Sequence, residues 1–355
     1  MKTKSEFPTE LGRIASIPRA QLFTGQTPLE PMPNLTEHCG GAELFVKRDD
    51  CTGLAFGGNK VRQMEFYLGA ASAENADTIL ITSAVQSNFV RVAAAGARKL
   101  GMTCHIQLEE RVAIKDPRYR DSGNLMIDRL LGATMHSYPE GEDEFGADRQ
   151  LGKISADLRD VGRRPYIIPL APGHPPLGSL GYVVAAHELL SQIKENRLSI
   201  NEIFVGSGSG ATHSGLLFGF RALGSAIQVT GVCVRRDVTR QRIRIRDTCE
   251  GIATLLETES KVTDDDIKLT DAFLAPGYGI PGQATLRAIV LGAQTEGLML
   301  DPVYSGKAMA AVIHHAELAD ESSTFVFVHT GGTPAIFAYQ KAIEEALVIS
   351  VGASQ

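Results

Sequence analysis

The sequence has few cysteines, and their positions exclude two kinds of cross-link. No two of them stand in a C-x-x-C pair, and the set is scattered and odd in number: Cys39, Cys51, Cys104, Cys233 and Cys249. Structural zinc sites use closely spaced cysteine or histidine pairs, and disulfide frameworks use even sets in an oxidising compartment. The pattern therefore predicts a protein of a reducing compartment that binds no metal.

Long apolar runs and a strong net charge are also absent. No stretch approaches the roughly 20 apolar residues of a membrane span. Residues 1–18 mix basic and acidic side chains without the apolar segment of a secretory signal. The net charge of −6 argues against a general nucleic-acid binder. We expect a cytoplasmic protein that has neither a membrane nor a nucleic acid as its partner.

The chain does have enough apolar residues for two lobes, with 355 residues of which 43% are hydrophobic. Strand-like and helix-like segments alternate along most of it, which predicts an α/β fold of doubly wound parallel sheets. Residues 19–40, rich in proline, are expected to form an extended arm. The expected strands are residues 43–47, 78–82, 103–108, 134–138, 166–169, 202–205, 228–234 and 324–329.

The segment Gly57–Arg62 is the first chemical motif. It places Lys60 directly after Gly-Gly-Asn, where a helix is expected to begin. The free N–H groups and the dipole of a helix start disfavour an ammonium ion, so they favour a neutral amine that can attack a carbonyl. Lys60 is therefore our candidate for a Schiff-base lysine. A flexible loop with a solvated lysine is the alternative interpretation of this motif alone.

A glycine-rich loop at residues 206–212 is the second motif. It follows an expected strand and precedes an expected helix, an arrangement that binds anions through backbone N–H groups. It also fits the G-x-G-x-x-A pattern of dinucleotide sites. However, the next strand ends at Arg235 and Arg236, with no acidic residue for a ribose hydroxyl. A nicotinamide-dependent reductase and a plain structural turn both stay open from this loop alone.

Three further segments carry polar groups at expected element ends. Gln86-Ser87-Asn88 precedes a helix and suits a carboxylate and a phenolic oxygen, although a simple helix cap explains it equally well. Tyr278 and Tyr304 lie in turns rich in glycine and proline. Thr330 follows the last strand, where a hydroxyl could face a ring nitrogen, or could cap a helix. In parallel sheets such strand ends are where ligands bind.

Together these segments resemble the pyridoxal-phosphate-dependent enzymes of the tryptophan-synthase-β fold. The branch that is most similar holds D-cysteine desulfhydrase, L-cysteate sulfo-lyase and 1-aminocyclopropane-1-carboxylate deaminase. The resemblance spans residues 27–339 and is carried by residues 46–50, 57–60, 86–88, 301–304 and 329–332. It implies two open doubly wound parallel-sheet domains (fold type II), pyridoxal 5′-phosphate as cofactor, a small amino acid as substrate and a homodimer.

The resemblance also implies a domain division and a set of cofactor ligands. Residues 53–171 would form the small domain, and residues 1–52 and 172–355 the large, cofactor-binding domain. Lys60 would carry the cofactor, Asn88 would bond its O3′ oxygen and Thr330 would face its pyridine nitrogen. Its phosphate would lie against Gly208, Ser209, Gly210, Ala211 and Thr212.

The substrate would be held by three side chains. Ser87 would bind its carboxylate or shuttle a proton, and Tyr278 and Tyr304 would flank it, so that Lys60, Ser87, Tyr278 and Tyr304 form the predicted catalytic set. The chain departs from the family pattern in two places. Phe89 stands where the branch usually has His or Gln, which leaves the exact substrate open, and Gln63 replaces a basic residue.

The predicted reaction is β-elimination from a D-cysteine or cysteate type of amino acid, giving pyruvate, ammonia and sulfide or sulfite. Ser305 supports it, since the cyclopropane deaminase has, by the resemblance, a glutamate at that position beside the pyridine nitrogen. A neutral residue there makes the ring a weaker electron sink, which suffices for a good leaving group. The cyclopropane deaminase is the alternative; a reductase and a non-catalytic pyridoxal-phosphate-binding protein are more distant ones.

A run of arginines between residues 235 and 246 has no assigned role in this scheme. We interpret it as a solvated or subunit-interface helix face, with attraction of an anionic substrate such as a sulfonate as the alternative. Its members are Arg235, Arg236, Arg240, Arg242, Arg244 and Arg246.

Overall fold

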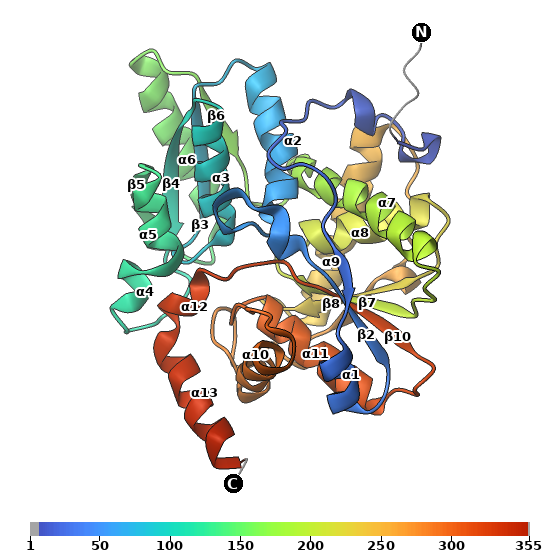
Figure 1. Ribbon diagram of the computed structural model, residues 1–355. Helices are drawn as coiled ribbons and strands as arrows, with labels where there is room; N and C mark the ends of the chain where they lie inside the picture. Colours follow the sequence, from blue (N-terminus) through green and yellow to red (C-terminus); the bar gives the residue numbers. More distant parts are fainter. Residues whose placement is uncertain (1–6, 354–355) are drawn as a thin grey trace.

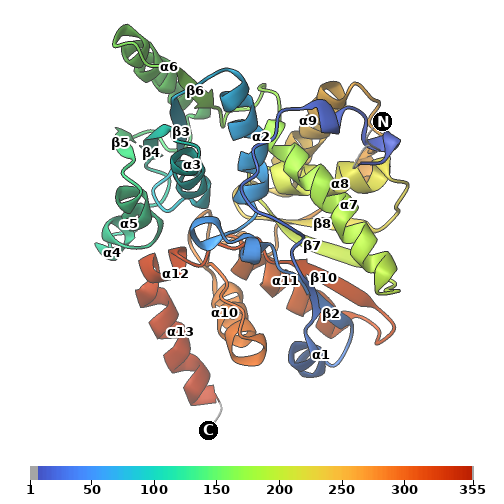
Figure 2. The ribbon, with the colours of Figure 1, turned by 45° about the horizontal axis from the view of Figure 1, so that its top comes forward.

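The computed structural model describes residues 7–353 of the chain and, toward the C-terminus, side chains up to residue 348. Two lobes face each other, each built on its own sheet: the one at the upper left of Figure 1 holds β3 to β6, and the other holds β1, β2 and β7 to β10. The same separation is visible after rotation (Figure 2). The α/β fold with two parallel-sheet domains is thus as expected.

The larger sheet has six strands in the order β1-β2-β10-β7-β8-β9. All its pairings are parallel except that of β1 with β2. The antiparallel pair lies at one edge, where the chain enters the lobe. The strand bounds are Leu29–Pro31 (β1), Glu43–Lys47 (β2), Glu202–Ser207 (β7), Gln228–Cys233 (β8), Lys268–Thr270 (β9) and Thr324–Val328 (β10).

The smaller sheet has four parallel strands in the order β5-β4-β3-β6. They are Thr78–Ala84 (β3), Thr103–Glu109 (β4), Thr134–Tyr138 (β5) and Pro165–Ile168 (β6). All four fall within the range 53–171 that we predicted for the small domain, and the boundary itself stays a prediction.

Helices cover both faces of each sheet. In the smaller lobe and its neighbourhood they are α2 (Lys60–Ala73), α3 (Asn88–Lys99), α4 (Arg118–Asp121), α5 (Gly123–Leu130) and α6 (Glu144–Asp160). In the rest of the chain they are α1 (Pro33–Cys39), α7 (Leu180–Glu195), α8 (Ala211–Ala222), α9 (Val238–Leu256), α10 (Gln283–Glu296), α11 (Ser305–Leu318), α12 (Ala335–Ala338) and α13 (Gln340–Ala353).

The cores follow from the two-residue period of the strands. In β7, Ile203 and Val205 pack with α7, α8 and α9, whereas Phe204 between them packs with α11 on the opposite face. In β3, Ile79 and Ile81 pack under α2 and α3, and Leu80 packs under α6. Every residue of β3 is buried, which explains its continuous apolar sequence. Burial on both faces holds the strand ends, and hence the site, in a fixed position.

The expected extended arm at residues 19–40 was wrong in part, because it contains β1 and α1. Pro33 starts α1, where a missing N–H costs nothing, and Gly40 ends it in a left-handed conformation. β9, α4, α12 and α13 were also not expected. β1 and β9 have three residues each, too few to show a period.

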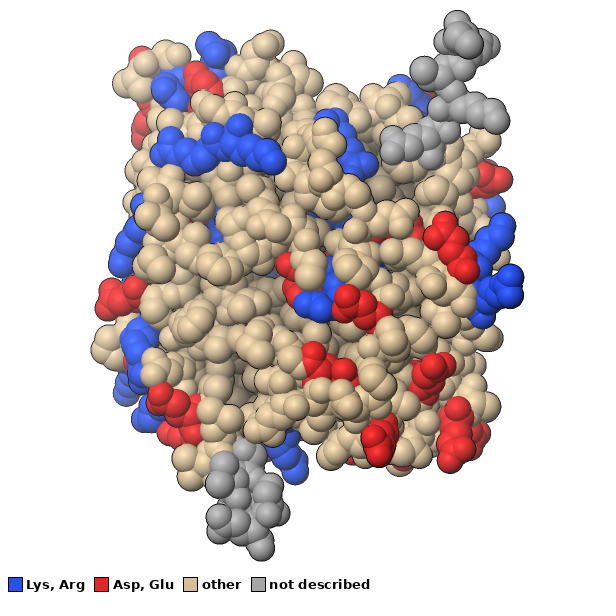
Figure 3. Space-filling view, viewed as in Figure 1, with Lys and Arg blue, Asp and Glu red and all other residues tan. Residues whose placement is uncertain are grey.

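Charged groups on the face shown in Figure 3 are mixed, with acidic side chains prominent at the lower right, where α1, β2 and β10 lie in Figure 1. Within residues 7–353, no helix is long and apolar enough to cross a membrane.

Candidate active site

A cavity of about 730 Å³ opens between the two lobes, at the carboxyl ends of their strands. Its wall is made by segments far apart in the sequence, from both lobes. All the residues predicted for catalysis and cofactor binding line this one cavity: Lys60, Ser87, Asn88, Gly208, Ser209, Gly210, Ala211, Thr212, Tyr278, Tyr304 and Thr330.

Lys60 is the first residue of α2 and lies on the cavity wall. Its Nζ donates to Gln63 Oε1 at 3.3 Å and lies 5.5 Å from the centre of the Phe89 ring. Burial lowers its pKa to about 8. The expected lowering of the lysine pKa is therefore present, and desolvation is its cause, where the sequence had suggested the helix dipole. Phe89, in place of a polar residue, contributes to the apolar surroundings of the amine.

The turn before Lys60 is packed tightly against the loop after β10. Asn59 N–H donates to the Thr330 carbonyl at 3.0 Å. A Cβ on Gly58 would lie 2.9 Å from that same carbonyl oxygen, and a Cβ on Gly331 would lie 2.6 Å from Gly58 Cα. Both glycines also have positive φ angles, 104° and 81°. Only glycine fits at these two positions, and their contact sets Lys60 beside Thr330.

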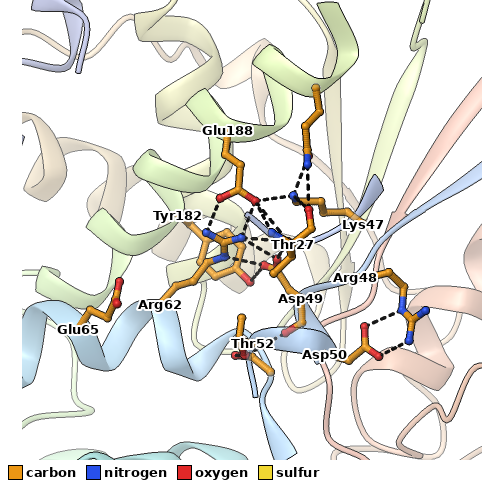
Figure 4. Close-up of polar contacts among 12 residues, drawn as sticks. Thr27, Lys47, Arg48, Asp49, Asp50, Thr52, Arg62, Glu65, Tyr182 and Glu188 are labelled. Carbon is orange, nitrogen blue, oxygen red and sulfur yellow. Dashed lines mark hydrogen bonds and ion pairs between the residues drawn. The ribbon is translucent and has the colours of Figure 1, made fainter. Parts of the chain in front are cut away.

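A buried network of charges anchors the first turn of α2 (Figure 4). Arg62, two residues after Lys60, donates to both oxygens of Asp49 at 3.0 and 3.2 Å. It also donates to both oxygens of Glu188 on α7 at 2.8 and 2.9 Å. Lys47, at the end of β2, donates to Glu188 at 2.5 Å. The charges are balanced, and each carboxylate has three cationic or hydroxyl partners, as buried ions require.

Two hydroxyl groups complete this network. The Tyr182 hydroxyl donates to Asp49, and the Thr27 hydroxyl donates to Asp49 at 2.7 Å. Burial alone would raise the pKa of Asp49, but Arg62, Lys47 and the Tyr182 hydroxyl more than offset it and lower the pKa. The segment 46–50, which carried the family resemblance, therefore serves to hold α2 against β2 and α7.

Ser87 and Asn88 form the start of α3. The Ser87 hydroxyl caps the helix by accepting from Phe89 N–H at 3.1 Å. Asn88 Oδ1 accepts from Asn124 Nδ2 at 2.9 Å and from Arg91 Nη2 at 3.4 Å. Because its oxygen is held by these donors, the Asn88 amide group is left to donate toward the cavity. Ser87 is therefore a helix cap that also lines the cavity, and its role toward a substrate carboxylate stays a prediction.

The loop after β7 presents backbone N–H groups to the cavity. Its carbonyls are held on the other side: Gly208 O accepts from Arg236 and from Gln241, and Ser209 O accepts from Arg244 at 2.8 Å. Gly210 has a φ of 96° and precedes α8, whose first N–H groups have no acceptor within the helix. Such a turn at a helix start binds an anion.

Thr212 adds a side-chain donor to this loop. Its Oγ1 accepts from Asn59 Nδ2 at 2.8 Å and from Gln63 Nε2 at 3.0 Å. A hydroxyl oxygen has two acceptor sites, and both are used here, so its proton is left for an acceptor in the cavity. Gln63 therefore supports the anion site by orienting Thr212. The family resemblance showed only that Gln63 stands where the family has a basic residue, and it did not suggest this role.

Tyr278 and Tyr304 meet on the cavity wall opposite the small lobe. Their hydroxyl oxygens are 2.8 Å apart, and their rings pack edge to face with centres 6.2 Å apart. Burial and the neighbouring Tyr278 raise the pKa of Tyr304 well above its usual range. Tyr304 therefore keeps its proton at neutral pH.

Thr330 and Ser305 differ in what they offer the cavity. Thr330 lines it. Ser305 is buried, donates its hydroxyl proton to Asp301 Oδ2 at 2.6 Å, and is not part of the cavity wall. The Asp301 carboxylate is itself bound by the N–H groups of Val303, Tyr304 and Ser305, each within 2.9 Å. Ser305 is therefore neutral, as assumed, but it belongs to the cap of α11.

Comparisons with known proteins agree with this geometry. The family model described as "Pyridoxal-phosphate dependent enzyme" matches residues 20–331. The chain belongs to this family. A D-cysteine desulfhydrase of Klebsiella pneumoniae subsp. pneumoniae is 40% identical over 332 residues, which are 93% of this chain and 98% of the relative. A D-cysteine desulfhydrase of Salmonella choleraesuis is 38% identical over 331 residues, again 93% and 98%.

Solved structures give the same result for the fold. A structure described as an ACC deaminase homologue has a TM-score of 0.85 and 31% identity, and the match covers 96% of this chain and 99% of that one. A fungal L-serine ammonia-lyase from Rhizomucor miehei has a TM-score of 0.60 at 17% identity, covering 90% of this chain and 98% of that one, and shares the fold alone. Membership of the pyridoxal-phosphate-dependent family replaces the reductase interpretation of the glycine-rich loop at residues 206–212.

The site fits the cofactor of this family. A phosphate suits the N–H groups of Gly208–Thr212 and the free proton of Thr212, since all of these are donors. Asn88 can donate to a phenolic oxygen, and Lys60 is a desolvated amine on the same wall. These assignments are the ones that we propose for the cofactor.

Several residues of the site were missed by sequence reasoning. Arg235, Arg236 and Arg244 are not a solvated or interface face, because Glu144 of the other lobe accepts from all three at 2.5 to 3.1 Å. Although burial opposes it, they lower the pKa of Glu144. Arg111 also lines the cavity. Arg111 could have been predicted as a site residue because it follows an expected strand, whereas no local sequence feature indicates that Glu144 belongs to the site.

A buried carboxylate lies behind the Asn88 region. Asp128 on α5 is fully buried, and neither of its oxygens has a hydrogen-bond partner in the described part of the chain. Burial raises its pKa to about 8, which the nearby Arg91 offsets only in part. The folded protein therefore holds a proton that the unfolded chain releases near pH 4.

This difference predicts how stability depends on pH. Between about pH 4 and pH 8 the unfolded state has lost the Asp128 proton and the folded state has not, so stability falls as the pH rises through this range. Asp128→Asn removes the titration. We expect its Tm to exceed that of the parent by more at about pH 8.5 than at about pH 5.5. Exposed Asp157→Asn serves as control, and an equal Tm difference at both pH values would contradict the assignment.

Proposed function

We propose that this protein is a pyridoxal-phosphate-dependent lyase that catalyses β-elimination from a small amino acid of the D-cysteine or cysteate type. With water, cysteine would give pyruvate, ammonia and hydrogen sulfide, and cysteate would give pyruvate, ammonia and sulfite. The observation that carries the proposal is the meeting of the desolvated Lys60 amine, the anion-binding loop and the tyrosine pair on one cavity. The relatives named D-cysteine desulfhydrase support the choice of substrate.

The residues divide the work as follows. The bound cofactor supplies an electron sink for the substrate's Cα. Ser87 and the free N–H groups at the start of α3 bind the substrate carboxylate. Lys60, with its pKa near 8, is partly neutral at physiological pH and can take the proton from Cα. Tyr304, hydrogen-bonded to Tyr278, keeps its proton and can donate it toward the leaving group.

The ACC deaminase homologue among the solved structures makes the cyclopropane deaminase the second candidate. One assay separates the two: pyruvate from D- and L-cysteine, cysteate and β-chloroalanine is measured beside 2-oxobutanoate from the cyclopropane amino acid. The Asp301 carboxylate, bound by three N–H groups and Ser305, is not on the cavity wall, so nothing charged replaces the deaminase glutamate there. We expect kcat/KM on cysteine or cysteate to exceed that on the cyclopropane compound by at least about tenfold.

The opposite order of kcat/KM would show that the deaminase is the function. Release of keto acid from none of these compounds would support a non-catalytic pyridoxal-phosphate-binding protein.

We also propose a cytoplasmic homodimer, the assembly that the family resemblance implies. Large apolar side chains are exposed on α5, α12 and α13, with Leu130 at 79%, Phe337 at 62% and Val348 at 74% exposure. Helix α13 projects from the body of the molecule (Figures 1 and 2). A partner subunit that covers these residues would remove apolar surface from water. The molar mass by light scattering tests this; a monomer at micromolar concentration would refute it.

A further inference from the structure

Two arginines on the cavity wall have donors that the protein does not use. Arg235 donates to Glu144 at 2.5 Å through Nη1 and to Glu142 at 3.1 Å through Nη2. Its Nε has no acceptor in the described part of the chain, although the side chain is only 7% exposed. Arg111 donates twice to Glu109 Oε2, through Nε and Nη2. Its Nη1 has no acceptor among residues 7–353. Both residues line the cavity.

These two arginines stand beside the tyrosines that flank the substrate. The Arg235 guanidinium lies 5.9 Å from the centre of the Tyr278 ring, and Tyr278 is hydrogen-bonded to Tyr304. Arg111 is close enough to Tyr304 for its charge to act on the pKa of that hydroxyl; it partly offsets the rise that burial causes. They come from the ends of β8 and β4, one in each lobe, and so face the same space from two sides.

Arg111 and Arg235 do not bind the cofactor phosphate. Arg236 and Arg244 also line the cavity, but they donate to the carbonyls of Gly208 and Ser209 in the phosphate loop. Neither Arg235 nor Arg111 contacts that loop in the described residues. The local charge is also in excess, because four arginines (Arg111, Arg235, Arg236 and Arg244) share two buried carboxylates, Glu109 and Glu144.

We propose that Arg111 and Arg235 form an anion subsite for the β-substituent of the substrate, so that the cavity prefers an amino acid whose β-group carries a fixed negative charge, such as a sulfonate. The inference rests on the proposed function and names its substrate class. A sulfonate offers three acceptor oxygens to the unused donors, whereas a thiol offers one weak acceptor. Cysteate should therefore bind more tightly than cysteine of the same configuration.

The test uses the holoenzyme and a non-reacting probe, 3-sulfopropanoate, which has the two acidic groups of cysteate and no amine. Butanoate, with an apolar end, is the matched compound. Arg235→Met should raise the Kd of 3-sulfopropanoate by about tenfold or more, measured by calorimetry, and leave that of butanoate within about twofold. The KM for cysteate should rise in parallel, with kcat/KM for β-chloroalanine changed by less than about threefold.

Two variants keep the test independent of folding. Arg235→Met leaves Glu144 with two arginines, so no buried carboxylate loses all its partners. Glu109→Gln/Arg111→Met removes both members of the other pair, which is milder than removing one. Arg246→Met, on α9 but paired at the surface with Asp264 and absent from the cavity wall, controls for general charge.

Equal Kd values for 3-sulfopropanoate in parent and both variants would overturn the proposal. So would an equal loss in Arg246→Met, or a loss of cofactor affinity in Arg235→Met without a change in sulfonate binding. Because the probe reports binding without turnover, these outcomes stay distinct from a failure of the proposed reaction, in which the parent would release no pyruvate.

Discussion

Lys60→Ala is expected to remove the absorbance band of the bound cofactor and to lower turnover by about 10³-fold or more. Lys60 lies at the start of α2, and it combines a pKa of about 8 with a place on the wall shared by the anion-binding loop. No other side chain on that wall is a lysine. Absorbance spectroscopy and borohydride reduction followed by peptide mapping would check the covalent link.

The controls for Lys60 separate chemistry from folding. Lys60→Arg keeps a positive charge but has no amine, so it should lose the covalent link as completely as alanine does. Lys153→Ala, at an exposed position on α6, should keep both the spectrum and the activity. The fold should persist, because Arg62 and its partners anchor α2 without Lys60. A borohydride-reducible cofactor adduct in Lys60→Ala would show that another residue carries the cofactor.

Gly208→Val is expected to weaken cofactor affinity by about 100-fold, which corresponds to about 2.8 kcal/mol. A Cβ at this position would lie 3.2 Å from the Tyr304 ring and 3.2 Å from Val234, so a branched side chain has to extend into the space of the phosphate. The carbonyl of Gly208 is held by Arg236 and Gln241, which prevents the loop from moving away. Titration of the apoprotein with pyridoxal phosphate measures the affinity.

A matched substitution isolates the effect of position. Gly152 lies on α6, and a Cβ there would have no atom within 4 Å. Gly152→Val should bind the cofactor as the parent does. The apoprotein Tm of Gly208→Val should fall by only a few degrees, because contacts of 3.2 Å with Tyr304 and Val234 need these side chains to shift by only a few tenths of an ångström. If both valine variants bound the cofactor equally well, the loop could not be the phosphate site.

The sequence determined the elements whose signal is local. The continuous apolar run of β3 and the strand at 43–47 were expected where they occur, and α2 begins at Lys60 as expected. Each of these signals lies within about fifteen consecutive residues, because hydrophobic periodicity and helix-capping residues are local features of the sequence. The predicted site residues also converge on one cavity, because all but Tyr278, in the loop between β9 and α10, follow the carboxyl end of a parallel strand or lie at a helix start.

Only the tertiary structure decided the contacts between distant segments. Arg62 pairs with Glu188, which is 126 residues away, and Arg244 pairs with Glu144, which is 100 residues away. Gln63 orients Thr212 across 149 residues. A charged or amide side chain has the same sequence signature whether it is solvated or paired, so its partner is decided by the path of the chain. Two arginines of α9 show this directly. Arg244 pairs with Glu144 of the opposite lobe and Arg246 pairs with Asp264 at the surface, because only one face of the helix meets the opposite lobe.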